Sequence, residues 1–163
     1  MSNALSALKN WLAANKAVWI FGALIIALDR ASKVWALAYL QTRDVEFFPY
    51  FRLHYVENTG MAFGLMQNGN LLLIGVMIAV LAYLVYSWKE LAANGPLVKW
   101  GALCIFAGAL GNLYDRITLG FVVDFLDFRV WPVFNVADSF ITIGGVLLAA
   151  ALLKPAKKAQ EEK

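Results

Sequence analysis

The chain has 163 residues, of which 61% are hydrophobic, and its mean hydropathy is +0.65. Ordinary globular chains are only about 45–50% apolar, so this composition favours a small membrane protein of one domain. The net charge of +3 is modest and does not point to a nucleic-acid-binding arm, and the single cysteine, Cys104, excludes an intrachain disulfide.

Four apolar segments predict an all-α membrane protein with four transmembrane helices, since roughly 20 apolar residues cross a bilayer. The expected spans are residues 17–40, 71–88, 97–114 and 137–153, within a single integral membrane domain of residues 1–163. Residues 17–28 alone have the length of a signal-peptide core. We prefer a continuous helix, because Asp29, Arg30 and Lys33 separate that core from the nearest small-residue cleavage pattern.

The lysines set the expected orientation. Four spans place both termini on one side, and the positive-inside rule makes that side cytoplasmic. The lysines that share it are Lys9, Lys16, Lys89, Lys99, Lys154, Lys157, Lys158 and Lys163. Residues 154–163 then form a cytoplasmic tail, and residues 1–16 could form a short helix on the inner membrane face. The segment 41–69 and the aromatic loop 115–136 lie on the outer (periplasmic) face.

The outer segment 41–69 contains a strand pattern. Phe51, Leu53 and Tyr55 alternate with more polar neighbours, and a turn signal follows at residues 58–60. This predicts a small β-sheet resting on the membrane surface. His54, the only histidine, is expected to face solvent or a neighbour, because no second histidine or cysteine cluster supports a metal site.

The candidate chemistry lies in residues 107–138, which carry four aspartates between two apolar segments. Acidic groups at the rim of a membrane segment are costly and are functional candidates by default. Asp115 precedes a cation, Arg116, and is predicted to belong to an ion-pair scaffold. Asp127, two residues before an arginine, is expected to be solvated or at the rim. Asp124 and Asp138 have no adjacent cation.

Asp124 and Asp138 are therefore the predicted catalytic pair. Two carboxylates in a water-poor pocket share one proton, which provides one base and one acid near neutral pH. The base would activate water for attack on a carbonyl, and the acid would protonate the carbonyl oxygen and help the amine to leave. The residues alone leave two other interpretations open: helix caps, or a proton or cation path.

Five sequence blocks closely resemble the prolipoprotein signal peptidase (signal peptidase II) family. They occur in the family's order over nearly the whole chain apart from the tails. The blocks are DRASK (29–33), NTGMAF (58–63), GALGNLYDR (108–116), VVDF (122–125) and FNVAD (134–138). One departure is Ala107, where the family often has a glycine; alanine still allows close helix packing.

The resemblance implies an aspartic endopeptidase of the bacterial cytoplasmic (inner) membrane. Such enzymes cut the signal peptide from a prolipoprotein just before its diacylated cysteine. By motif, Asp124 and Asp138 match the catalytic pair. The residues expected to support the site or contact substrate are Asn112, Asp115, Arg116, Asn135, Asn58, Gly60, Asp29 and Lys33. The family uses no metal or other cofactor, its partners are diacylated prolipoproteins and membrane lipids, and cyclic peptide antibiotics occupy its site.

Two other classes of function compete with this hypothesis. A small proton- or cation-coupled transporter could use the same acids, but it predicts charges at mid-span depth and often an inverted repeat, which we do not find. A non-catalytic membrane scaffold would need neither Asp124 nor Asp138. Asp29 and Lys33, four residues apart on one helical face, could form a structural ion pair or contact the site or a lipid headgroup.

Overall fold

The computed structural model describes residue 6, residues 15–60 and residues 69–153. The predicted helix within residues 1–16, part of the outer segment (61–68) and the predicted cytoplasmic tail lie largely or wholly outside the described residues. The helices are α2 (Lys16–Tyr39), α3 (Asn70–Tyr86), α4 (Trp88–Ala93), α5 (Pro96–Thr118) and α6 (Val136–Leu152). The strands are β1 (Val45–Phe48), β2 (Phe51–Asn58) and β3 (Val122–Asp127). The fold is mostly helical with a small antiparallel sheet.

Helix α5 is the centre of the bundle, and α2, α3 and α6 pack against it. Small residues bring α5 and α6 together. A Cβ at Gly108 would lie 2.4 Å from the backbone oxygen of Ala137, and one at Gly144 would lie 2.5 Å from that of Gly101. Side chains at these positions would force the helices apart, so the glycines determine how closely the two helices approach.

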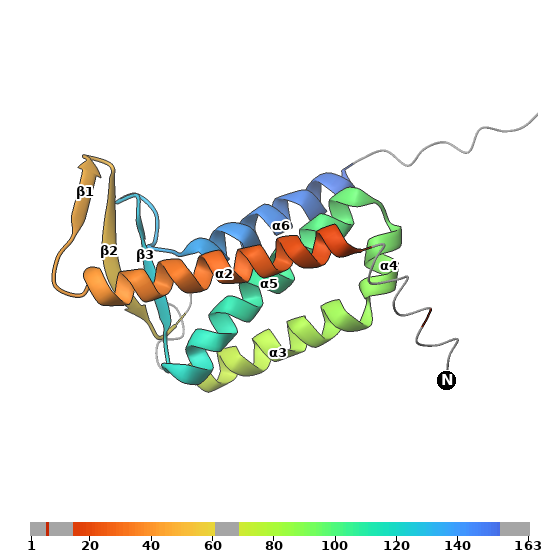
Figure 1. Cartoon of the computed structure of the whole chain (residues 1–163), viewed down its shortest axis with the longest axis horizontal. Coiled ribbons are helices and arrows are strands. Elements are labelled where there is room, and N and C mark those ends of the chain that lie inside the picture. Colours follow the sequence, from red (N-terminus) through yellow and green to blue (C-terminus); the bar gives the residue numbers. More distant parts are fainter. Residues whose placement is uncertain (1–5, 7–14, 61–68, 154–163) are drawn as a thin grey trace, which may run out of the picture.

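The sheet covers one end of the bundle, in the order β1-β2-β3 (Figure 1). In its antiparallel register, Val56 of β2 is opposite Asp124 of β3. Ala36 on α2 and Val123 and Phe125 on β3 form a buried cluster that attaches the sheet to the bundle. The start of α2, the end of α6 and α4 lie at the opposite end (Figure 1).

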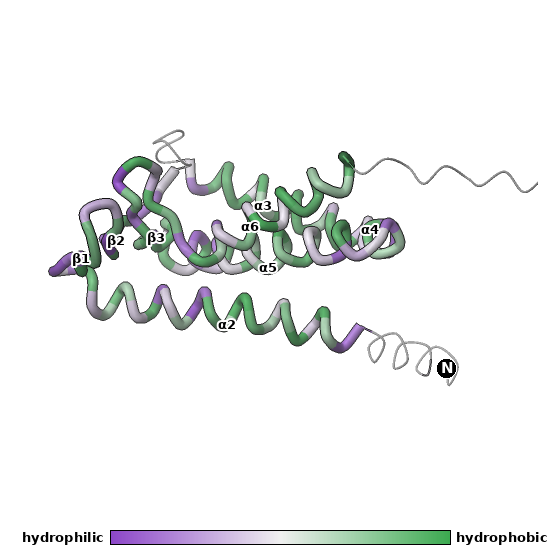
Figure 2. The backbone as a smooth tube through the Cα atoms, turned by 90° about the horizontal axis from the view of Figure 1, so that it is seen from above, coloured by the Kyte–Doolittle hydropathy of each residue, from purple (hydrophilic) through white to green (hydrophobic). Residues whose placement is uncertain are grey.

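The outward surface of the helices is apolar. Leu24 on α2, Leu71 on α3 and Val146 on α6 expose 60%, 83% and 63% of their surface. Figure 2 shows hydrophobic colouring along the helices, and hydrophilic residues in the sheet and in the half of α2 nearer to it. Within the described residues, α5 alone is both long and apolar enough to be a candidate span by itself; α3 and α6 are shorter apolar helices. Large exposed apolar surfaces of this kind mark contact with lipid or another apolar partner.

Helices lie at all four predicted spans, but the polar elements between them differ from the prediction. Helix α5 continues to Thr118, so Asp115 and Arg116 are helical rather than in a loop. The predicted outer loop also contains strand β3, and the predicted loop after Trp88 contains the short helix α4. Strand β3 is buried on both faces, so its sequence lacks the alternation that identified β2.

Candidate active site

Asp124 lies in the middle of β3, where only 1% of its surface is exposed. The amide Nδ2 of Asn58, on the neighbouring strand β2, donates to its Oδ2 at 2.9 Å. Nδ2 of Asn135 donates to its Oδ1 at 2.7 Å. Both oxygens of the carboxyl group are therefore held by neutral amide donors, and no cation among the described residues pairs with it directly.

Asp138 is in the first turn of α6 and forms part of the structure that begins this helix. Asn135 is the N-cap: its side chain accepts a hydrogen bond from the backbone N–H of Asp138 at 2.9 Å. In return, the carboxyl oxygen Oδ2 of Asp138 accepts from the backbone N–H of Asn135 at 3.3 Å. This reciprocal capping box fixes the orientation of Asp138, and the helix N-terminus favours a negative charge there.

Two asparagine amides join the aspartates. Nδ2 of Asn112, on α5, donates to Oδ1 of Asp138 at 2.7 Å. Asn135 Nδ2 donates both to Asp124 Oδ1 and, at 3.1 Å, to Asn112 Oδ1. The sequence predicted that Asp124 and Asp138 would meet, and the structure brings them together around these amides. It also shows that Asn135 takes part as both the helix cap and the bridge.

Both aspartates line a cavity of about 830 Å³ between the sheet and helices α3, α5 and α6. Its lining includes the apolar side chains Leu73 and Met77 on α3 and Ile141 on α6. The predicted residues Asn58, Gly60, Asn112 and Arg116 line it as well. The site thus combines two carboxyl groups with an apolar cavity that is large enough for a peptide segment.

The pKa of Asp124 is raised from its ordinary 3.8 to about 7. Burial is the largest cause, because it disfavours the charged form, and the nearby charge of Asp138 adds to it. The hydrogen bonds from Asn58 and Asn135 oppose this shift. A carboxyl group that titrates near neutral pH can both hold and release a proton during a reaction.

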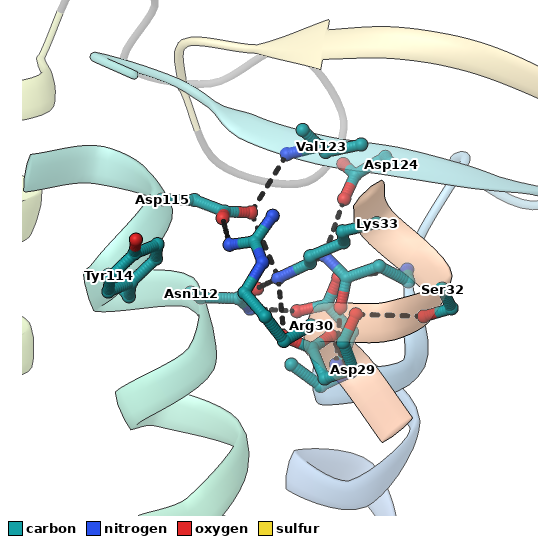
Figure 3. A network of polar contacts seen from close by, with 12 residues as sticks. Asp29, Arg30, Ser32, Lys33, Asn112, Tyr114, Asp115, Val123 and Asp124 are labelled. Carbon is teal, nitrogen blue, oxygen red and sulfur yellow. Dashed lines mark hydrogen bonds and ion pairs between the residues drawn. The ribbon is translucent and has the colours of Figure 1, made fainter. Parts of the chain in front are cut away.

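A buried ion network lies behind the pair (Figure 3). Lys33, which is 0% exposed, extends from α2 toward α5. Its ammonium lies 3.0 Å from Asp29 Oδ2 and 3.0 Å from Asp115 Oδ2, and it donates to Asn112 Oδ1 at 2.7 Å. Arg30 also pairs with Asp115. Because Lys33 and Asn135 both donate to the Asn112 oxygen, the Asn112 amide nitrogen must face Asp138.

The carboxylate of Asp29 anchors the helix that carries the second aspartate. Its Oδ1 accepts from the backbone N–H of Ala137, in the first turn of α6, at 3.0 Å. A Cβ at Gly111 would lie 2.5 Å from its Oδ2, so α5 leaves room for this carboxylate only with glycine there. The i, i+4 ion pair of Asp29 and Lys33 that the sequence suggested is present.

Arg116 is positioned differently from the prediction. It was expected to pair with the adjacent Asp115, but its guanidinium turns toward the cavity. Nη2 donates to the backbone oxygen of Gly60 at 2.5 Å, and Nη1 donates to Asn70 at 3.1 Å. Gly60 is held in turn by its N–H, which donates to Asn58 Oδ1 at 3.0 Å. Arg116 therefore fixes the end of strand β2 beside the cavity.

Three further details differ from the sequence-based expectation or were missed. Asp127, predicted to be solvated or at the rim, is 5% exposed and pairs with Arg52 on β2. Arg30 and Asn70 were not predicted to contact the site. Their partners are 85 and 46 residues away in sequence, so no local pattern reveals them.

Among the described residues, no group of three His, Cys, Asp or Glu side chains could hold a metal ion.

The sequence profile of the family described as Signal peptidase (SPase) II matches residues 21–154. The chain belongs to the signal peptidase II family. This membership makes it a peptidase. It is 43% identical to the lipoprotein signal peptidase of Syntrophomonas wolfei over 140 residues, which cover 83% of this chain and 91% of that protein. It is 44% identical to the lipoprotein signal peptidase of Clostridioides difficile over 138 residues, covering 80% and 90%.

A solved structure described as a bacterial membrane enzyme has the same fold. It aligns with a TM-score of 0.79 at 29% sequence identity, covering 91% of this chain and 94% of its own. A second structure with the same description aligns with a TM-score of 0.75 at 28% identity, covering 86% and 95%. Signal peptidase II membership and this likeness indicate a membrane enzyme.

Proposed function

We propose that this protein is an intramembrane aspartic endopeptidase that removes the signal peptide from diacylglyceryl-modified prolipoproteins, cutting before the lipidated cysteine. The substrate class follows from the family and from relatives named lipoprotein signal peptidase. The single observation that supports the aspartic mechanism best is the placement of Asp124 and Asp138 on one cavity, joined by shared amides.

The proposed setting is the bacterial inner membrane, with α2, α3, α5 and α6 crossing it. The apolar outward surfaces of these helices support this arrangement. The start of α2, the end of α6 and helix α4 would then face the cytoplasm, and the sheet and the cavity, at the opposite end of the bundle, would lie at the outer face. A prolipoprotein signal peptide is itself a membrane segment, so a site at this level can receive it sideways from the bilayer.

In the proposed reaction, Asp124 and Asp138 share one proton and act as a pair. The ionised carboxylate takes a proton from water, which attacks the carbonyl carbon of the scissile peptide bond. The protonated partner gives its proton to the carbonyl oxygen, and a later proton transfer lets the amine leave. The raised pKa of Asp124 supports this sharing near neutral pH.

The neighbouring residues would hold the pair rather than react. Asn112 and Asn135 donate to the carboxyl oxygens and so fix the directions in which the remaining lone pairs point. Lys33 fixes Asn112 in turn. Because these groups are buried and already paired, they need little reorganisation when charge moves during the reaction. The apolar cavity walls would exclude bulk water around the bond.

The test uses purified protein in detergent or lipid with a diacylated prolipoprotein, with cleavage followed as a mobility shift on a gel. Asp124→Asn and Asp138→Asn should each abolish cleavage while the protein stays folded. Asp44→Asn, which makes the same chemical change just before strand β1 and outside the cavity lining, should leave cleavage unchanged. Full turnover by either of the first two variants would reject the aspartic mechanism. No cleavage by the unmodified protein would reject the proposed substrate.

A further inference from the structure

The loop that joins β3 to α6 forms part of the wall of the cavity. Residue 128 and residues 130–134 all line it. The loop begins at Asp127, three residues after Asp124 on the same strand, and it ends at Asn135, whose amide contacts Asp124. Both ends of this loop are therefore attached directly to the proposed catalytic machinery, which does not itself use Asp127.

Asp127 fastens the first end of the loop with both carboxyl oxygens. Its Oδ2 accepts from Nε of Arg52, on the middle strand β2, at 2.6 Å. Its Oδ1 accepts from the backbone N–H of Arg129, inside the loop, at 2.7 Å. The side chain is only 7% exposed, so the carboxylate depends on these partners in place of water. One carboxylate thus ties the loop backbone to the sheet.

Arg129 provides a second tie, to a different strand. Its Nη2 donates to Oε1 of Glu46, on the edge strand β1, at 2.5 Å. Its backbone has φ of 60°, a left-handed conformation that residues other than glycine adopt at some cost. The contacts with Asp127 and Glu46 hold this turn in place. Such conformations persist only where the surrounding structure determines them.

Aromatic ring contacts also attach the loop to the sheet and to its own far end. The ring of Phe128 lies 4.8 Å from that of Phe51 on β2 and 5.9 Å from that of Phe134 at the far end of the loop. Phe134 also closes the loop by pairing with Leu126: its N–H donates at 3.1 Å and its oxygen accepts at 2.8 Å. The polar contacts of Asp127 and Arg129 and the ring contacts of Phe128 together define one position of the loop.

We infer that Asp127 and Arg129 are positioning residues, which fasten loop 128–134 to strands β1 and β2 so that it forms a fixed cavity wall against which the peptide substrate is held. This inference rests on the proposed function for its substrate and on the contacts above for its geometry. The wall touches the cavity but supplies no group that reacts, so losing its ties should weaken substrate binding more than it slows bond cleavage.

The first test compares steady-state cleavage by graded variants. Asp127→Ala removes both ties of the carboxylate and should raise KM about tenfold with kcat changed by less than about threefold. Asp127→Asn keeps an acceptor for the Arg129 N–H and should raise KM only about threefold. In Arg129→Gly, glycine adopts the left-handed backbone conformation without strain, so this variant removes only the ion pair with Glu46. The single variant Arg129→Glu should raise KM, and the charge-swapped double variant Glu46→Arg with Arg129→Glu should return KM most of the way to its original value. Asp44→Asn, which removes the negative charge of a different partner of Arg52, is the matched control and should leave KM unchanged.

The second test measures the loop without using activity. Backbone hydrogen–deuterium exchange should become faster at Val130 and Phe134 in Asp127→Ala, because their N–H groups bond to oxygens within and beside the loop. Exchange in α5 should stay unchanged. If Asp127→Ala unfolds, Arg129→Gly and the charge-swapped pair decide in its place.

The results separate the two proposals. A fall in kcat at constant KM, unchanged exchange in the loop, or no recovery in the charge-swapped pair would overturn the role of Asp127 and Arg129. If the unmodified protein does not cleave a prolipoprotein, the proposed function fails, and the exchange measurement alone then confirms or refutes that these residues fix the loop.

Discussion

Replacing Asp124 with asparagine should change the stability of the fold with opposite signs at low and high pH. The pKa of this carboxyl group rises from 3.8 to about 7 on folding, through burial first and the charge of Asp138 second. Because the folded state binds the proton of Asp124 more tightly than the unfolded state does, the stability that this group contributes is fully present below pH 3.8. That contribution is lost as the pH rises through about 7.

The structure gives the size of both effects. A pKa change from 3.8 to about 7 corresponds to about 4 kcal/mol above neutral pH, since one pKa unit is worth about 1.4 kcal/mol. Asparagine removes this cost. It also places an NH₂ group where Asn58 and Asn135 both donate, so one hydrogen bond is lost, at about 1–3 kcal/mol. The net change is about 1–3 kcal/mol of stabilisation near pH 8 and a similar destabilisation near pH 4.

The assay is unfolding in detergent, followed by tryptophan fluorescence near pH 4 and near pH 8, for the unmodified protein, Asp124→Asn and Asp44→Asn. The midpoint of Asp124→Asn should lie below that of the unmodified protein at the lower pH and above it at the higher pH. The pKa of Asp44 is lowered, mainly by its bond to His54, so its variant should show no gain at the higher pH. A difference of the same sign and size at both pH values would refute the reasoning about Asp124.

Three further outcomes follow from the geometry. Cleavage should fall above about pH 7, when Asp124 loses the proton that the pair shares, and a pH–rate profile of kcat measures this. Lys33→Ala removes the ammonium that two buried carboxylates share and should lower the free energy of unfolding by about 3–5 kcal/mol, yet it should reduce cleavage less than Asp124→Asn; a larger loss of cleavage would reverse that ranking. Gly108→Ala should lower the thermal midpoint, because its Cβ would meet the backbone of α6, whereas Gly145→Ala, with nothing within 4 Å, should be neutral.

The helices and the candidate pair were accessible from the sequence for simple reasons. Apolar runs of spanning length gave the positions of α2, α3, α5 and α6, and the alternation around Leu53 gave strand β2. Asp124 and Asp138 stood out because no cation is adjacent to either in the sequence. Each of these features depends on residues that are close together in the chain.

The features that were missed depend on distant partners. The segment at β3 was predicted to be a loop because its sequence lacks the alternation of polar and apolar residues. That alternation is missing because both faces of the strand are buried. Asp127 was expected at the rim because Arg129 is its neighbour in sequence, but its side chain pairs with Arg52, 75 residues away. Arg116 was expected to bind the carboxylate next to it, whereas that carboxylate pairs with Arg30 and Lys33 on another helix.

The buried ammonium of Lys33 also constrains how the protein is made. In the proposed membrane setting, α2 leaves the ribosome with Asp29, Arg30 and Lys33 in its C-terminal half. Arg30 and Lys33 pair with Asp115 on α5, which is translated later. Until α5 is inserted, burying these charged side chains of α2 in lipid is energetically costly, which favours positions of α2 that keep them near water. In that setting, newly synthesised chains truncated before α5 should insert less stably, and should be degraded faster, than chains that include α5.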